Sequence, residues 1–137
     1  NEPDGISADS AQADWLRAGL AASQTPWQIV VMHHAPYTSS ERGPVEDLRW
    51  PYAEWGADAV LSGHDHFYER LEVDQIPYIV NGLGGNSIYA FGTPIPASQA
   101  RFNGDFGALL VEASTDCLSL RFFTRAGVLA DQSVMRR

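Results

Sequence analysis

The four histidines of the chain occur in two pairs, and each pair closely follows an apolar run. His33 and His34 come directly after Trp-Gln-Ile-Val-Val-Met, and His64 and His66 come after Ala-Val-Leu and a Ser-Gly pair. Short apolar runs of this composition are typical of buried strands. A neutral imidazole binds a transition-metal ion without a thiolate, and a stiff strand end fixes its direction. The two pairs therefore predict a metal site at the ends of two strands.

The spacing of His64 and His66 suits metal binding. Side chains two positions apart in an extended backbone point the same way, so the two imidazoles could bind one ion or bridge a pair of ions. An arbitrary His-x-His is more often a solvent-exposed turn. The preceding apolar run, Gly63 and the second histidine pair favour the metal-binding interpretation here.

His33 and His34 are adjacent, which limits how both can act. Neighbouring residues in a strand face opposite sides, so we expect at most one of the two to be a metal ligand. The other is expected to hydrogen-bond substrate or to support a ligand. The alternative is that one of them packs beneath Tyr37 and Trp27 as a hydrogen-bonded core histidine.

Charged residues and glycines surround the second histidine pair. Asp65 points away from both histidines in an extended turn, so we expect it to support a ligand or to contact solvent. Glu69 and Arg70 are expected to form a structural ion pair. The glycine-rich turn over 82–85 is interpreted as close backbone packing beneath the site, because neither a lysine nor a helix follows it to complete a phosphate cradle.

The elements around the histidines indicate a layered α/β architecture. We expect a helix over 8–22, capped by Ser7, followed by the first buried strand over 27–32. A second helical segment over 45–55, broken or kinked at a proline, precedes the second buried strand over 58–62.

The remaining chain favours short strands and turns. A hairpin is expected from strands over 69–73 and 78–81, and an irregular loop over 87–104, where two prolines argue against a central strand. Three further strands are expected to close the fold as an antiparallel meander, over 107–113, 117–124 and 128–134.

Composition limits the classes of fold and partner. A length of 137 residues with 45% apolar content suits one domain over residues 1–137. The formal net charge of -8 argues against a nucleic-acid surface or an anionic membrane as the main partner, and an anionic substrate would need a local positive centre such as a metal. Cys117 is the only cysteine, so no internal disulfide and no cysteine-rich zinc site can form. No apolar run is long enough for a membrane-spanning helix.

Two motifs resemble those of a known enzyme family. Val30-Val31-Met32-His33 is similar to the Val-x-x-His motif, and Gly63-His64-Asp65-His66 to the Gly-His-x-His motif, of the calcineurin-like metallophosphoesterases. The following Phe-Tyr-Glu-Arg and the later Tyr-Ile-Val-Asn-Gly-Leu-Gly-Gly are similar to the purple acid phosphatase branch. The resemblance implies the C-terminal half of a four-layer α/β/β/α sandwich, with a mixed sheet and closing antiparallel strands.

The resemblance also implies metal-dependent hydrolysis of phosphate esters at a dinuclear centre. His33 and His64 would bind one metal ion and His66 the other, the ions being two of iron, zinc, manganese or a similar metal. Two such ions clamp a phosphate ester and stabilise its entering and leaving oxygens. A periplasmic or secreted location is favoured by the resemblance, whereas the residues themselves do not indicate a compartment.

The sequence departs from the family pattern in two respects. The upstream motifs that supply a bridging carboxylate and an asparagine ligand are absent, since no Asn-His pair occurs in the chain. Arg42 stands where purple acid phosphatases often have a histidine that protonates the leaving group. Arginine stays charged, so Arg42 can grip phosphate but cannot act as a general acid. Either His34 or an upstream histidine would supply the proton, or the leaving group must be a good one.

Three arrangements are compatible with these residues. The chain can be the C-terminal portion of a phosphoesterase domain, inactive when isolated. Such a half domain exposes a sheet edge and apolar surface, so it should associate with the missing N-terminal half or as a homo-oligomer. The chain can instead be a non-catalytic metal-binding or interaction module that holds at most one ion. Lastly, it can be one piece of a nicked enzyme whose other piece stays associated.

Overall fold

The computed structural model describes residues 5–137, in which two β-sheets and one α-helix form the regular structure. The helix is α1 (Ala11–Ala22), and a short 3-10 helix spans Glu46–Leu48. The strands are β1 (Ile29–Val31), β2 (Ala59–Ser62), β3 (Tyr68–Val73), β4 (Ile76–Asn81), β5 (Ser98–Phe102), β6 (Gly107–Ala113), β7 (Cys117–Thr124) and β8 (Leu129–Arg136).

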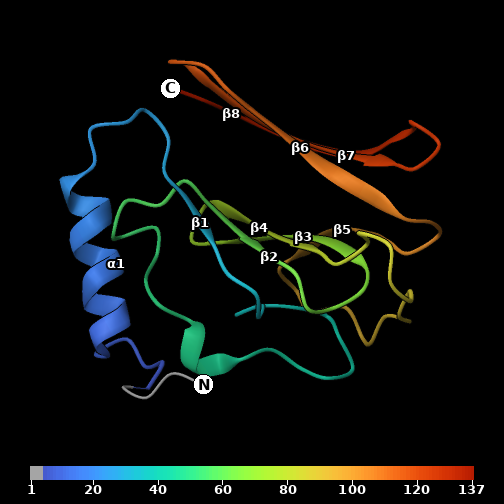
Figure 1. Cartoon of the computed structure of the whole chain (residues 1–137), viewed down its shortest axis with the longest axis horizontal. Helices are drawn as coiled ribbons and strands as arrows, with labels where there is room; N and C mark the ends of the chain where they lie inside the picture. Colours follow the sequence, from blue (N-terminus) through green and yellow to red (C-terminus); the bar gives the residue numbers. More distant parts are fainter. Residues whose placement is uncertain (1–4) are drawn as a thin grey trace.

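The larger sheet is mixed and the smaller one is antiparallel. The larger sheet has the strand order β1-β2-β4-β3-β5, in which β1, β2 and β4 run parallel while β3 runs antiparallel to both of its neighbours. The smaller sheet is the meander β6-β7-β8. Figure 1 shows this sheet, in orange and red, as a separate layer, with α1 in blue beside β1. The predicted α/β class, with a mixed sheet and closing antiparallel strands, is confirmed.

The side chains of β4 alternate between two hydrophobic cores. Tyr78 packs into a core that includes Leu20 of α1. Its neighbour Ile79 packs into a second core that includes Leu120 and Phe122 of β7. Because both faces of the larger sheet are covered, its central strands carry nearly continuous apolar runs. The order of layers within residues 5–137 is therefore helix, larger sheet, smaller sheet.

The first helix starts three residues later than predicted. The hydroxyl of Ser10 accepts a hydrogen bond from the N–H of Ala13 at 3.2 Å and so caps α1. Ser7, the predicted cap, donates its hydroxyl hydrogen bond to Asp9 instead. No helix in residues 5–137 combines the length and apolar character needed to cross a bilayer.

The helical segment predicted over 45–55 is wrong for most of its length. Glu46–Leu48 forms one turn of 3-10 helix, and the residues after it form turns. Trp50 and Tyr52 are buried in the core beside α1, with ring centroids 5.8 Å apart. Pro51 between them lacks a backbone N–H and cannot donate the hydrogen bond that a continuous helix would need at this position.

The region 87–104 is less irregular than predicted, because it contains β5. This strand pairs with β3 and forms an edge of the larger sheet. Pro94 and Pro96 lie before β5, so neither interrupts the ladder. The other predicted strands are confirmed, including the hairpin β3-β4 and the closing meander; β6 and β7 have the predicted bounds, and the ends of the rest are shifted.

Arg70 connects the two sheets, and the predicted ion pair of Glu69 with Arg70 is wrong. The Nε of Arg70 donates to Oδ2 of Asp131 on β8 at 2.7 Å, and Nη2 donates to Oδ1 at 3.1 Å. The hydroxyl of Tyr68 donates to the same carboxylate at 2.8 Å. Burial, reinforced by this hydrogen bond, raises the pKa of Tyr68. Glu69 faces the opposite side of β3, because neighbouring strand residues alternate.

One edge of the larger sheet carries exposed apolar side chains. β1 forms this edge and pairs on one side with β2. The side chain of Val31 on β1 is 73% exposed, and Trp15 on the nearby helix is 74% exposed. An exposed edge strand with apolar side chains is a surface on which another strand can pair.

Candidate metal centre

The parallel pairing of β1 with β2 brings the two histidine pairs together. Val31 lies opposite Leu61 in the ladder. The pairing continues past both strands, since the N–H of Gly63 donates to the carbonyl of His33 at 3.1 Å. Carboxyl ends of adjacent parallel strands lie at one edge of the sheet, so the residues that follow them meet there. The structure therefore places both histidine pairs at strand ends, as the sequence predicts.

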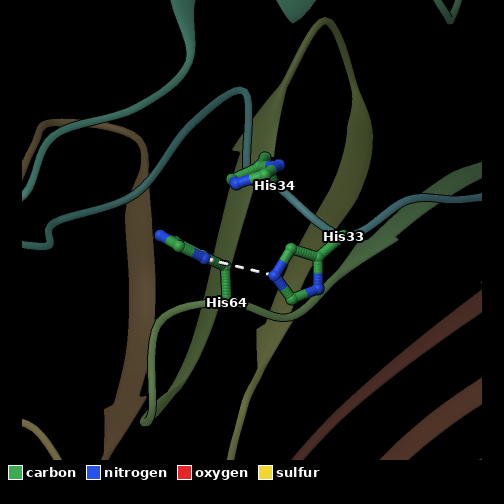
Figure 2. A group of neighbouring side chains, drawn as sticks. All are labelled: His33, His34 and His64. Atoms are coloured by element: carbon green, nitrogen blue, oxygen red, sulfur yellow. Dashed lines mark hydrogen bonds between the residues drawn. The ribbon is translucent and has the colours of Figure 1, made fainter. Parts of the chain in front are cut away.

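Three imidazoles converge at this edge (Figure 2). They belong to His33, His34 and His64, and one ring nitrogen from each lies within 4.8 Å of the others. The Nε2 of His33 lies 3.2 Å from the Nδ1 of His64. Nitrogens bound to one zinc ion at about 2.0–2.1 Å are about 2.8–3.4 Å apart at ligand angles of about 90–110°. His33 and His64 therefore have the spacing of two ligands on a common ion.

His34 lies beside the other two imidazoles, contrary to the expectation that it faces away from His33. Its ring centroid is 4.5 Å from that of His64 and 4.8 Å from that of His33. The expectation assumed a continuing strand, but β1 ends at Val31 and both histidines lie in a bend. Both are exposed, so neither is a core histidine beneath Tyr37. Partial burial and the neighbouring His64 and His33 lower the pKa of His34, which favours its neutral form.

His66 points away from this cluster. The expected common direction of His64 and His66 is wrong, because His64 has a left-handed backbone conformation with φ of 64° and residues 64–67 form a bend. The Nδ1 of His66 lies 3.2 Å from the hydroxyl of Ser87. Its ring stacks on Tyr89 with centroids 4.1 Å apart and an interplanar angle of 16°. The turn thus directs its two imidazoles to different places.

Comparisons with known proteins show what this fold and site are similar to. The calcineurin-like phosphoesterase profile matches residues 2–68, the part that contains both histidine pairs. Tartrate-resistant acid phosphatase type 5 of Homo sapiens is 31% identical over 87 residues, covering 60% of this chain and 27% of that protein. The chain is thus similar to the calcineurin-like phosphoesterases.

Further similar proteins are purple acid phosphatases. Fe(3+)-Zn(2+) purple acid phosphatase 12 of Arabidopsis thaliana is 41% identical over 83 residues, covering 53% of the chain and 18% of that protein. Purple acid phosphatase PPD1 from yellow lupin seeds has the same fold, with a TM-score of 0.86, 21% identity and coverage of 97% of the chain and 29% of that structure. The chain spans about a quarter or less of the curated relatives' length.

Arg42 is exposed and contacts Tyr89 rather than the cluster of three. Its guanidinium carbon is 4.4 Å from the centroid of the Tyr89 ring, which also carries His66. Tyr89 was not identified from the sequence. Its position in a region without a clear pattern gave no signal of this contact.

Two buried carboxylates hold the segment that leads to Arg42. Asp65, 1% exposed, accepts a hydrogen bond from the hydroxyl of Thr38 at 3.0 Å. Glu69, 0% exposed, accepts hydrogen bonds from the N–H of Ser39 at 2.7 Å and from the hydroxyls of Ser39 and Ser98. The expected solvent contact of Asp65 is therefore wrong, while its supporting role stays open. The carboxylate of Glu69 fixes segment 38–40 against β3 and β5.

The glycine-rich turn divides into a packed and an open part. A Cβ on Gly82 would lie 2.2 Å from the backbone oxygen of Asp65, so only glycine fits beneath the turn that carries the histidines. Gly84 and Gly85 would meet nothing within 4 Å. Close backbone packing is thus confirmed at Gly82 and wrong for the two glycines after it.

Proposed function

We propose that this chain supplies the histidine ligands of a dinuclear centre that hydrolyses phosphate esters. The observation that carries the proposal is the 3.2 Å separation of His33 Nε2 and His64 Nδ1, which suits one ion. His66, directed elsewhere by the turn, would bind the second ion. Imidazole ligands are compatible with zinc and iron, and one relative is named an Fe(3+)-Zn(2+) enzyme; manganese is the third candidate.

The residues around the ligands would handle the phosphate ester. When bound, the metal ions would supply Lewis-acid stabilisation of the phosphoryl oxygens and activation of water. Arg42 would grip a phosphate oxygen, since its guanidinium stays charged. His34 beside the ligands would hydrogen-bond the substrate in its neutral form, which its lowered pKa favours, and would pass a proton to the leaving oxygen only from its protonated form.

The proposed centre requires residues from outside this chain. Within residues 5–137 the convergent cluster contains three imidazoles and no carboxylate, so a bridging carboxylate would come from an upstream N-terminal half of the domain. That half would add a strand at β1 and cover the exposed side chains of Val31 and Trp15. The isolated chain is then expected to be inactive and to associate with the missing half or with itself.

Hydrolysis of p-nitrophenyl phosphate tests the proposal. The chain joined to its upstream half is assayed with added manganese, zinc or iron. We expect metal-dependent hydrolysis that the double substitution His64→Ala, His66→Ala abolishes. Glu72→Gln, a change at an exposed residue of β3, serves as the matched control and should leave the rate within about twofold. Unchanged hydrolysis in the histidine double variant would contradict the proposal.

A second candidate is a non-catalytic metal-binding or interaction module. The same fold occurs in a structure described as GAP50, the anchor in the inner membrane complex of Plasmodium, with a TM-score of 0.80, 21% identity and coverage of 90% of this chain. A shared fold does not specify activity. Metal titration separates the two candidates, because a module with this histidine cluster alone should bind one ion whether or not the upstream half is present, whereas the enzyme should bind two when complete.

A periplasmic or secreted location stays a prediction that rests on the family resemblance. Fractionation of cells that express the natural gene would test it. Recovery of the protein in the cytoplasmic fraction alone would contradict the prediction.

A further inference from the structure

Tyr89 contacts two residues that the proposed function uses. The ring of His66 stacks on it with centroids 4.1 Å apart, and the guanidinium carbon of Arg42 lies 4.4 Å from the Tyr89 centroid. A cation near an aromatic face is attracted by the ring quadrupole, and a stacked ring restricts rotation of an imidazole. One aromatic ring therefore constrains both side chains.

The backbone of Tyr89 is fixed from two directions. Its N–H donates to the carbonyl of His66 at 2.9 Å, which ties it to the histidine turn. Its carbonyl accepts a hydrogen bond from the side-chain amide of Asn103 at 2.9 Å, which ties it to the chain after β5. The backbone that carries the ring is thus hydrogen-bonded to that of His66.

The segment that carries Arg42 is held against the same loop. The N–H of Gly92 donates to the carbonyl of Ser39 at 2.8 Å, and a Cβ on Gly92 would lie 2.7 Å from that oxygen. The hydroxyl of Ser39 accepts a hydrogen bond from the N–H of Ile95 at 3.1 Å. The segments that lead to Arg42 and away from Tyr89 are therefore packed together at Ser39 and Gly92.

We propose that Tyr89 is a positioning residue that holds the imidazole of His66 and the guanidinium of Arg42 in fixed relation to each other. This inference rests on the proposed function for its catalytic meaning. As a consequence, a phosphate bound by Arg42 would lie beside the metal ion that His66 would bind. The aromatic ring, rather than the hydroxyl, makes both contacts, so phenylalanine should replace Tyr89 and leucine should not.

The test compares Tyr89→Leu, Tyr89→Phe and a control, Phe91→Leu. Phe91 lies in the same loop and packs on Phe67 with ring centroids 4.7 Å apart, so its loss removes an aromatic ring from the loop but not the contacts with His66 and Arg42. The variants are made in the protein that includes the upstream half. KM and kcat for p-nitrophenyl phosphate and zinc affinity at the second ion site are measured.

Tyr89→Leu should raise KM about two- to fivefold, because Arg42 loses its contact with the ring. It should also lower the zinc affinity of the second site about tenfold, because His66 loses its stacking partner. In Tyr89→Phe, both KM and the zinc affinity of the second site should stay within about twofold of wild type. In a double-mutant cycle, Arg42→Ala should raise KM less in the Tyr89→Leu background than in wild type. Full additivity in that cycle, or equal losses in Tyr89→Leu and Phe91→Leu, would overturn the positioning role.

A measurement without substrate separates failure of this inference from failure of the proposed function. In NMR spectra of the chain, the ring protons of His66 should be shifted upfield by the Tyr89 ring current. The shift should persist in Tyr89→Phe and vanish in Tyr89→Leu. If the wild-type protein hydrolyses no phosphate ester, the proposed function fails, while zinc affinity and the ring-current shift still decide whether Tyr89 positions His66.

Discussion

Glu69 on β3 accepts hydrogen bonds from both the N–H and the hydroxyl of Ser39, a residue 30 positions earlier in the chain. The hydroxyl of Ser98 on β5 donates to the same carboxylate at 2.6 Å. A fully buried carboxylate is stable in a protein only when such donors surround it. This contact ties the loop that leads to Arg42 to the sheet that carries His66.

Glu69→Gln should destabilise the fold by about 1–3 kcal/mol. The amide group of glutamine turns a donor toward groups that also donate, which leaves a buried donor unpaired. Urea unfolding followed by circular dichroism measures the change in the free energy of unfolding. The control is Glu72→Gln on the same strand, where the side chain is exposed and the change should stay within about 0.5 kcal/mol. Equal effects of the two substitutions would show that the buried hydrogen bonds of Glu69 do not contribute to the free energy of unfolding.

His33→Ala and His64→Ala should each weaken zinc binding to the isolated chain by about a hundredfold or more, since loss even of a residue that only supports a ligand costs about 10–100-fold. Isothermal titration calorimetry at neutral pH measures the affinity. His66→Ala is the matched control, because His66 points toward Ser87 and lies outside the cluster of three. A stoichiometry of two ions in the isolated chain, or an equal loss in His66→Ala, would contradict the assignment.

Gly82→Ala should destabilise the fold by about 1–3 kcal/mol and reduce zinc affinity. The added Cβ would lie 2.2 Å from the backbone oxygen of Asp65, so the histidine turn must shift. Gly84→Ala, two residues along the same turn, meets nothing within 4 Å and should be close to neutral. Thermal unfolding and zinc titration of both variants provide the comparison. Wild-type zinc affinity in Gly82→Ala would show that the turn tolerates the shift.

The free energy of unfolding should fall as pH rises above about 10. Burial raises the pKa of Tyr68, so the folded protein keeps this proton at a pH where the unfolded chain loses it. The stabilisation is complete below the unfolded pKa and is lost as pH rises through the folded pKa, by up to about 1.4 kcal/mol per pH unit. Tyr68→Phe should reduce this slope, and it should cost about 1 kcal/mol at neutral pH because Asp131 loses one donor. Identical slopes in the two proteins would assign the alkaline loss to other groups.

Val31→Lys should reduce association of the isolated chain. Val31 lies 73% exposed on the edge strand β1, and a lysine there opposes pairing with another strand. Sedimentation velocity at micromolar concentration should show wild type as an associated species and the variant as mostly monomer. Val128→Lys, an exposed valine outside the strands of the larger sheet, is the control. A monomeric wild-type chain would contradict the expected association.

The sequence by itself predicted every strand except β5, and its two histidine motifs carried the family resemblance. Runs such as 59–61 specify a buried strand through their own composition, and the two histidine motifs follow such runs directly. This local pattern was enough to predict that the histidines lie at the ends of two strands, and the family resemblance implied that His33 and His64 lie close together.

Only the tertiary structure decided where the other side chains point. The direction of His34 depends on where β1 ends, and the divergence of His66 from His64 depends on one left-handed backbone angle, neither of which is encoded in residue spacing. The partners of Glu69 and the contacts of Tyr89 come from segments far away in the sequence. Hydrogen bonds and ring contacts of this kind depend on how the whole chain packs. The local sequence pattern therefore indicates which residue types form the site, but not which of them contact one another.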